Sequence, residues 1–188
     1  MMKPLLLLAL ALLIPAAFGY LPAEPRPMAA ASPEGLYLVR LVPATQEERP
    51  MVSVYQRTTD GVRYEKVREF PLAGGDGAVA VFVTDTGDVY TFCDWVGDRK
   101  HAVAFRYPAE GGRPKRYSMR DLLPASQLEE LARIPRSRAP LRWRREGPYW
   151  VGGKNALVGV LVVPDVLGGA IAFNGETVEY ESPEKRKP

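Results

Sequence analysis

Four aspartates, Asp85, Asp88, Asp94 and Asp98, form the densest group of carboxylates in the chain. Calcium binds about six to eight oxygen ligands, and clustered aspartates beside a glycine turn can supply several of them. We therefore predict Asp85, Asp88 and Asp94 as candidate calcium ligands, although their spacing is not that of an EF-hand loop. Aspartate and glycine are also turn residues, so the same pattern predicts two hairpin loops.

Paired carboxylates could also cleave a glycosidic bond, one as acid and one as base or nucleophile. This alternative, a secreted hydrolase with or without calcium, requires two of these aspartates or Glu146 to meet in one pocket. His101 is the single histidine, Cys93 is the single cysteine, and no Gly-x-Ser-x-Gly motif is present. A Cys93–His101 dyad would require the two side chains to meet in space, whereas the apolar setting of Cys93 predicts a buried thiol. We predict no catalytic residues and no cofactor.

Six arginines lie between residues 133 and 145 with no acidic residue among them. Guanidinium groups bind phosphates and carboxylates, and indole rings provide stacking surfaces. The candidate binding residues are therefore Arg142, Arg144, Arg145, Trp143 and Trp150. The alternatives are a solvated connector, or a strand with Trp143 buried and the arginines outside. The predicted partners are envelope proteins, glycans or other polyanions.

A nucleotide is not among the expected partners. The segment 147–155 contains glycines and a lysine, as a phosphate-binding loop does. However, Asn155 stands where such a loop needs a hydroxyl residue, and Pro148 interrupts it.

The N-terminus has the pattern of a secretory signal peptide. Lys3 precedes the apolar run Leu5–Ile14, and Pro15 and the small residues Ala17 and Gly19 follow it. The run is shorter than the roughly 20 residues that a membrane-spanning helix needs. We predict cleavage after Gly19 and an exported protein, periplasmic or extracellular, that is not an integral membrane protein afterwards.

The remaining chain is predicted to hold one folded unit. Residues 20–35 are rich in proline and alanine and are typical of a linker. Residues 36–180 form a single β-rich domain, and residues 181–188 form a charged, flexible tail. The formal net charge of +3 indicates no particular partner.

Strand patterns dominate this domain and predict a mainly β fold. The predicted strands are 36–42, 52–55, 62–70, 78–83, 89–92, 101–107, 157–163, 170–173 and 176–180. Asp60-Gly61 and Asn174-Gly175 predict hairpins, because both positions of such pairs can take positive φ. Alternation predicts that His101, Val103, Phe105 and Tyr107 share one face of their strand. The expected arrangement of these antiparallel strands is a sandwich, a barrel or a partial propeller.

One or two short helices are expected around residues 118–134. Ser118–Asp121 and Ser126–Glu129 both match the capping box at a helix start. Pro124 stops the first helix, and the second ends by Ile134 with Leu128 and Leu131 on the same side.

The segments 84–95, 102–107 and 117–123 have a recognisable succession of turn and core residues. They resemble exported bacterial proteins of unknown function in which a meander similar to a propeller blade precedes a short Ser-x-x-Asp-Leu-Leu helix. The resemblance supports the β assignment and implies no activity or site. The function expected from the sequence is a non-catalytic envelope or extracellular module for binding or structure. The carboxylate hydrolase and a polyanion-binding protein using the arginine segment are the alternatives.

Overall fold

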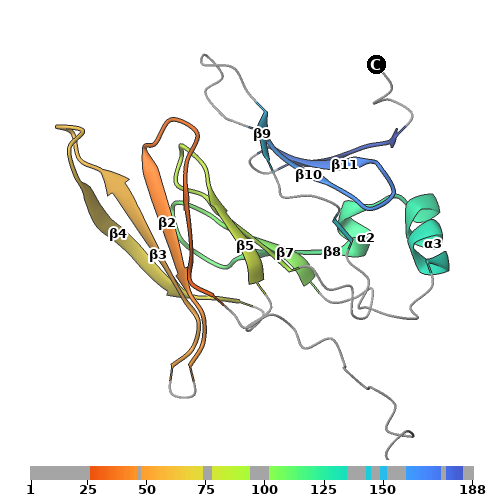
Figure 1. The fold of residues 1–188 in the computed structure, drawn as a ribbon, viewed down its shortest axis with the longest axis horizontal. Helices are drawn as coiled ribbons and strands as arrows, with labels where there is room; N and C mark the ends of the chain where they lie inside the picture. The colour runs from red at the N-terminus through yellow and green to blue at the C-terminus, as the bar shows by residue number, and fades with distance from the viewer. Residues whose placement is uncertain are drawn as a thin grey trace, which may run out of the picture.

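The computed structural model describes residues 26–45, 48–73, 78–93, 102–134, 143–144, 149–151, 160–174 and 177–183. The predicted signal peptide lies outside these residues. Within them the chain forms three four-stranded antiparallel sheets in which the strands follow sequence order (Figure 1). Sheet 1 contains β1 (Met28–Ala31), β2 (Tyr37–Val42), β3 (Met51–Arg57) and β4 (Tyr64–Pro71). Sheet 2 contains β5 (Ala78–Val83), β6 (Val89–Cys93), β7 (Ala102–Tyr107) and β8 (Lys115–Ser118). Sheet 3 contains β9 (Tyr149–Val151), β10 (Val160–Pro164), β11 (Ala170–Asn174) and β12 (Thr177–Glu181).

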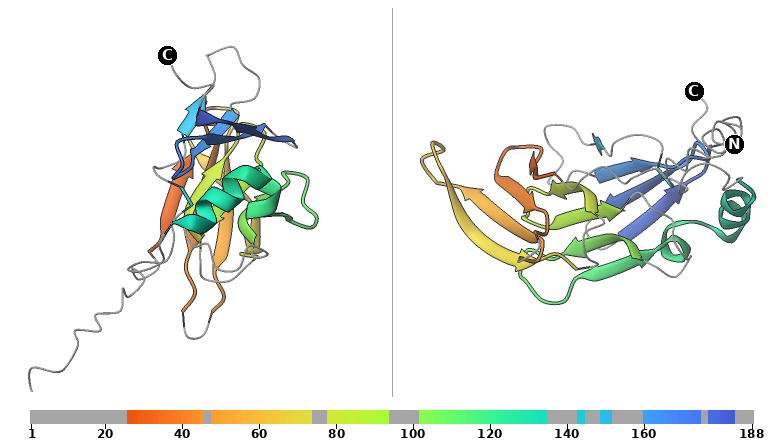
Figure 2. Two further views of the ribbon diagram at one scale, coloured as in Figure 1. Left: turned by 90° about the vertical axis from the view of Figure 1, so that its right-hand side faces the viewer. Right: turned by 60° about the horizontal axis from the view of Figure 1, so that its bottom comes forward.

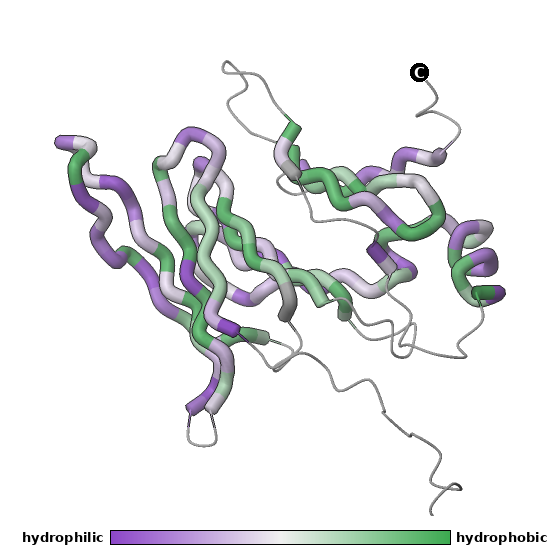
Figure 3. Tube along the Cα trace, in the orientation of Figure 1, coloured by the Kyte–Doolittle hydropathy of each residue, from purple (hydrophilic) through white to green (hydrophobic). Residues whose placement is uncertain are grey.

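The three sheets form a stack with sheet 2 in the middle (Figures 1 and 2). Core A joins sheets 1 and 2. Its buried residues from sheet 1 are Val39, Leu41, Val52 and Val54, and the partly buried Tyr37 and Phe70 pack against them. Core B joins sheet 2 to sheet 3 and to the helices. Because β5 supplies Val81 and Val83 to core A and Ala80 and Phe82 to core B, its sequence is a continuous apolar run. The edge strand β4 differs from β5 in this respect. Figure 3 shows hydrophobic residues along β5 and mostly hydrophilic residues along β4.

The mainly β prediction is confirmed, and the described strands form open sheets rather than a closed barrel. Three short strands, β1, β8 and β9, were not predicted from the sequence. β1 lies inside the segment expected to be a linker, where Met28 and Ala30 pack against core A. A short edge strand is held mainly by backbone hydrogen bonds to its neighbour. Its side chains need not show the apolar alternation by which a strand is recognised in a sequence.

The hairpin predicted at Asp60-Gly61 is confirmed by the antiparallel pairing of β3 with β4. Gly61 alone has a positive φ, of +72°, and Asp60 does not share this conformation. The prediction that His101, Val103, Phe105 and Tyr107 share one face was wrong for the described residues. Val103 packs in core B, whereas Phe105 and Tyr107 pack in core A. A register shift between Ala102 and Ala104 breaks the alternation that placed these residues on one face.

The helices α2 (Met119–Leu122) and α3 (Ala125–Arg133) confirm the predicted pair. At the start of α2 the backbone N–H of Ser118 donates to Asp121 Oδ2 at 2.7 Å, as in the predicted capping box. The second capping box is wrong, because Pro124 occupies the N-cap of α3 and Ser126 lies within its first turn. The predicted face of α3 is confirmed, since Leu128, Leu131 and Ile134 all contact core B.

Candidate functional site

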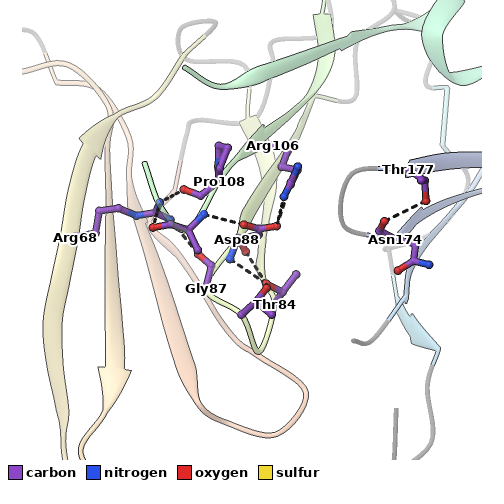
Figure 4. Close-up of polar contacts among 10 residues, drawn as sticks. Arg68, Thr84, Gly87, Asp88, Arg106, Pro108, Asn174 and Thr177 are labelled. Carbon is purple, nitrogen blue, oxygen red and sulfur yellow. Dashed lines mark hydrogen bonds and ion pairs between the residues drawn. The ribbon is translucent and has the colours of Figure 1, made fainter. Parts of the chain in front are cut away.

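Asp88, one of the three predicted calcium ligands, lies in a buried ion pair. It follows the turn between β5 and β6, in which Gly87 has a φ of +89°. Its Oδ2 accepts a hydrogen bond from Nε of Arg106 at 2.9 Å and forms an ion pair with Nη2 of the same guanidinium at 2.8 Å (Figure 4). Its Oδ1 accepts a hydrogen bond from the Ala109 N–H at 2.8 Å. Both carboxylate oxygens are therefore engaged by groups of the protein itself.

Arg68, on β4 of sheet 1, connects sheet 1 to this polar cluster of sheet 2. From β4, its Nη1 donates to the carbonyl oxygens of Pro108 and Ala109, and its Nη2 donates to that of Gly87 at 3.0 Å (Figure 4). Partial burial lowers the pKa of Arg68, while the negative charge of Asp88 acts in the opposite direction. Arginine keeps its charge under such shifts, so the guanidinium remains a donor to all three carbonyls. The cluster thus links the two sheets and has a structural role.

The other predicted metal ligands do not join Asp88. Asp85 Oδ1 accepts a hydrogen bond from the Glu34 N–H at 3.0 Å, which ties it to the turn between β1 and β2. Asp94, like Asp98 and His101, lies outside the described residues. Among the residues that are described, no three histidine, cysteine, aspartate or glutamate side chains come close enough together to hold a metal ion.

The described tryptophans of the predicted arginine–tryptophan site lie in or against core B. Trp143 is fully buried, and its Nε1–H donates to the carbonyl oxygen of Cys93. The half-buried Trp150 contacts Phe82 edge-on, with ring centroids 6.4 Å apart. The half-buried Arg144 forms an isolated backbone bridge with Asp165. Arg142 and Arg145 lie outside the described residues. The burial of Trp143 agrees with that part of the strand alternative, and the placement of the arginines on the outside stays a prediction.

A second buried carboxylate, Asp165, was not singled out from the sequence. Its Oδ1 accepts hydrogen bonds from the N–H groups of Leu167 and Gly169 at 2.7 and 2.9 Å, which closes the turn between β10 and β11. Its Oδ2 and the hydroxyl of Tyr180 both lie against Gly169, where an added Cβ would be 2.9 and 2.2 Å from them. Burial raises the pKa of Tyr180, and the nearby charge of Asp165 raises it further. The Asp-x-x-Gly-Gly succession was the available signal, but it is indistinguishable from an ordinary turn.

The loop between β3 and β4 is organised by its own hydrogen bonds. Thr58 Oγ1 accepts from the Arg63 N–H at 3.2 Å and also bonds to Asp60 Oδ1. The same Asp60 oxygen accepts from the Val62 N–H at 3.0 Å. These hydrogen bonds, the one from Thr58 first, lower the pKa of the Asp60 carboxyl. These hydrogen bonds connect the two sides of the hairpin tip.

This hairpin also carries the most exposed apolar side chains of the described residues. Val62 is 78% exposed and Val67 is 52% exposed, and Tyr64 and Leu36 lie at the same end of sheet 1. The hydroxyl of Tyr64 donates to the Gly35 carbonyl at 2.7 Å, which joins the hairpin to the neighbouring turn. A shallow depression of about 590 Å³ lies along the hairpin. Its lining is mostly polar and consists of Gln56, Arg57, Thr58, Thr59, Asp60, Arg63, Glu65 and Val67.

Comparison of this chain with protein-family models, curated proteins and solved structures found no match. In the part of the chain that the structure describes, no helix has both the length and the apolar character needed to cross a membrane. The site is therefore interpreted from its own geometry.

Proposed function

We propose that this protein is an exported, non-catalytic binding module of the cell envelope or the extracellular space. Its binding element is the hairpin formed by β3 and β4, residues 51–71. The observation that carries the proposal is the exposure of this hairpin, in which every side chain from Tyr64 to Val67 is exposed although the segment is a regular strand. Function concentrates on loops held by a rigid scaffold, and exposed apolar side chains mark interaction surfaces.

The polar clusters support a non-catalytic role for the described residues. Asp88 is engaged by Arg106 and Ala109, and Asp165 closes a turn of sheet 3. A hydrolase would need a pair of carboxylates facing one cavity. The described depression is lined by two carboxylates, Asp60 and Glu65, but it lies on an exposed hairpin, and Asp60 accepts hydrogen bonds from its own loop.

Site-specific crosslinking tests the binding element. A photoreactive amino acid replaces Val62 in the full chain, and intact cells of the source organism are irradiated. We expect a discrete crosslinked species that is identified by mass spectrometry and lost on the additional change Val67→Asp. The matched control carries the same probe at Glu129, an exposed residue of α3. Equal crosslinking at Val62 and Glu129, or none at Val62, would overturn the proposal.

Export is tested separately, because the hairpin could bind a partner in any compartment. N-terminal sequencing of the protein recovered from the periplasm or the medium should begin at Tyr20. Recovery of an uncleaved chain from the cytoplasm alone would contradict the export part of the proposal and leave the crosslinking result interpretable.

Polyanion binding is a second candidate, supported by exposed cations around β8. Arg113, Lys115, Arg116 and Arg120 are all exposed within eight residues. Such binding weakens steeply as salt rises, because bound counterions are released. Retention on a heparin column should fall in the triple variant R113Q/R116Q/R120Q, if β8 is the site, or in R142Q/R144Q/R145Q, if the arginine segment is. Retention that neither variant changes would exclude both.

A further inference from the structure

The strand β4 forms a free edge of sheet 1. The strand order of this sheet is β1-β2-β3-β4, so β4 pairs with β3 on one side and with no described strand on the other. In Figure 1 it is the outermost strand of the stack. With eight residues β4 is the longest of the described strands, and an edge strand presents unpaired backbone N–H and C=O groups. Another extended segment can pair with these groups.

A hydrogen bond at the hairpin tip determines which backbone groups of β4 face outward at that end. The Thr58 N–H donates to the Arg63 carbonyl, so these two residues form a hydrogen-bonded pair. Hydrogen-bonded and non-hydrogen-bonded pairs alternate along an antiparallel ladder, and the next pair is Arg57 with Tyr64. The N–H and C=O groups of Tyr64 therefore point away from β3, toward the free edge.

The same reasoning applies at the other end of β4. The Leu72 N–H donates to the Pro50 carbonyl, so the pairs that follow alternate from there. Pro71 then occupies a position whose groups face outward, which suits a residue without an N–H. Two residues earlier, Glu69 lies opposite Ser53 in a pair of the same kind, so its N–H and C=O also face the free edge.

A β-bulge interrupts the edge between these two positions. Arg68 pairs with Val54 and Lys66 pairs with Tyr55, so Val67 has no partner residue on β3. Bulges and charged side chains on an edge strand disfavour indiscriminate pairing, including pairing with a second copy of the same edge. Since β4 carries both, a partner has to match two short stretches, one on each side of the bulge. This favours a specific partner segment over another copy of this chain.

The depression along the hairpin lies beside this edge and contains a carboxylate that can select the partner. Glu65 and Val67 of β4 line it together with Gln56 of β3. Glu65 is exposed, and it forms no ion pair with any residue that the structure describes. Asp60, the other carboxylate of the lining, is engaged by its own loop and lies 3.8 Å from Arg63 Nη2. A cationic side chain on an added strand would complement Glu65, because opposite charges stabilise facing residues of neighbouring strands.

We propose that β4 binds an extended peptide segment of a partner protein by strand addition, with a lysine or arginine of that segment facing Glu65. Backbone hydrogen bonds to Tyr64 and Glu69 supply affinity, and the depression beside Glu65 supplies selectivity. This mode of binding rests on the proposed function, because it specifies how the β3–β4 hairpin holds its partner.

Peptide selection and hydrogen exchange test this proposal on the full mature chain. A phage-displayed library of peptides of about twelve residues, enough for one strand and its flanks, is selected against the protein. The enriched peptides should be rich in β-branched and aromatic residues and share one basic position. A synthetic selected peptide should slow amide exchange at Tyr64 and Glu69 by about tenfold or more. If no peptide is enriched, or if exchange at both amides is unchanged, the proposal is overturned.

A proline at position 69 tests the backbone contact directly. Glu69→Pro removes the outward N–H and should weaken peptide binding by about tenfold, whereas Glu69→Ala loses the same carboxylate but keeps the N–H. Glu69→Ala should therefore bind the peptide clearly more tightly than Glu69→Pro, and equal affinities would overturn the proposal. Circular dichroism checks that both variants are folded. N-methylation of single peptide residues gives the same test without altering the protein, and only alternate residues should be sensitive.

Charge exchange tests the role of Glu65. Glu65→Lys, and replacement of the basic peptide residue by glutamate, should each weaken binding by about two- to fivefold, as is usual for an exposed ion pair. Their combination should restore most of the loss. The matched control, Glu129→Lys on α3, should leave peptide affinity unchanged. If the combination restores nothing, the placement of the basic residue opposite Glu65 is wrong.

The crosslink at Val62 separates this inference from the proposed function. If the Val62 probe forms the same crosslink in the wild-type chain and in E69P, the hairpin binds through its side chains, and strand addition is wrong while the proposed function stands. Loss of the crosslink in E69P supports both. Absence of any crosslink at Val62 contradicts the proposed function itself. A wild-type chain that sediments as a dimer, with the dimer lost in E69P, would assign the edge to a second copy and overturn the proposal.

Discussion

Core A and core B hold the same middle sheet but use different interactions. On its sheet 1 side, the buried residues of core A are valines and a leucine, and Phe70 stacks on Tyr107 with ring centroids 4.6 Å apart. A polar cluster beside core A joins Arg68, Asp88 and Arg106. Core B is aromatic: Phe173 contacts Tyr90, Phe92 and Tyr117, with ring centroids 5.4 to 5.6 Å apart. Sheet 1 is thus attached mainly by aliphatic side chains, one stacked ring pair and directional hydrogen bonds, and sheet 3 by a network of several rings.

The difference indicates where each interface is sensitive to change. Aromatic pairs contribute burial and preferred ring geometry, so a truncation there leaves a large cavity. A buried ion pair contributes little net stability when complete, but it is costly when one partner is removed. Core B should therefore respond to loss of volume, and the junction beside core A to loss of charge.

The largest effect is expected for Phe173→Ala. The side chain is 1% exposed and contacts three other rings, so its removal should lower the free energy of unfolding by about 3–5 kcal/mol. Urea unfolding followed by tryptophan fluorescence measures the change. Val67→Ala, at an exposed position, is the control and should stay within about 0.5 kcal/mol. A loss at Phe173 no larger than that of the control would show that core B is not a packed aromatic cluster.

Asp88→Ala should lower the free energy of unfolding by about 3 kcal/mol, because it leaves the Arg106 guanidinium buried without its carboxylate. The double variant Asp88→Leu/Arg106→Met replaces both charges with apolar groups and should recover much of the loss. The urea midpoints of the three chains decide this, with Arg63→Ala as the exposed control. If the double variant is less stable than Asp88→Ala, the ion pair itself contributes to stability, and the two interfaces differ less than their contacts suggest.

Gly169→Ala should cost about 1–3 kcal/mol, because the new Cβ would lie 2.2 Å from the Tyr180 hydroxyl oxygen. Tyr180→Phe removes that oxygen, so the double variant should be more stable than Gly169→Ala alone. Thermal unfolding of the four chains of this cycle gives the coupling between the two positions. Strictly additive changes would mean that Tyr180 does not pack against Gly169.

The smallest expected effect is a dependence of the free energy of unfolding on pH, which the buried tyrosines cause only at alkaline pH. Burial raises the pKa of Tyr90 and of Tyr107 above the ordinary value of 10.0, and it also raises that of Tyr180. Below pH 10 these phenols are protonated in the folded and the unfolded chain. Above it the unfolded chain releases its protons first, so stability should fall as pH rises.

Urea midpoints measured between about pH 8 and pH 11 test this dependence, and Tyr90→Phe should make it shallower. Tyr64→Phe, at an exposed position, is the matched control. A midpoint that does not change up to pH 11 would contradict the burial of these phenols.

The candidate sites were harder to predict from the sequence than the strands and turns that carry them. The spacing of Asp85, Asp88 and Asp94 was compatible with a cation site, but the partners of Asp88 come from positions 106 and 109, on β7 and just beyond it. The exposed tip of the β3–β4 hairpin was predicted as a turn and not as a binding site. Turn residues predict that the chain reverses, but they do not indicate how far the hairpin projects from the core.

The sequence by itself determined the mainly β class, the positions of most strands and turns, and the ends of the two helices. These features follow from local preferences, such as alternation along β2, glycine at the positive φ of Gly61 and the stop at Pro124. Only the tertiary structure decided that three sheets stack in sequence, that Trp143 is buried, and that a register shift turns Val103 toward core B. These outcomes depend on which distant surfaces fill the same space, and no local pattern in the chain encodes that choice.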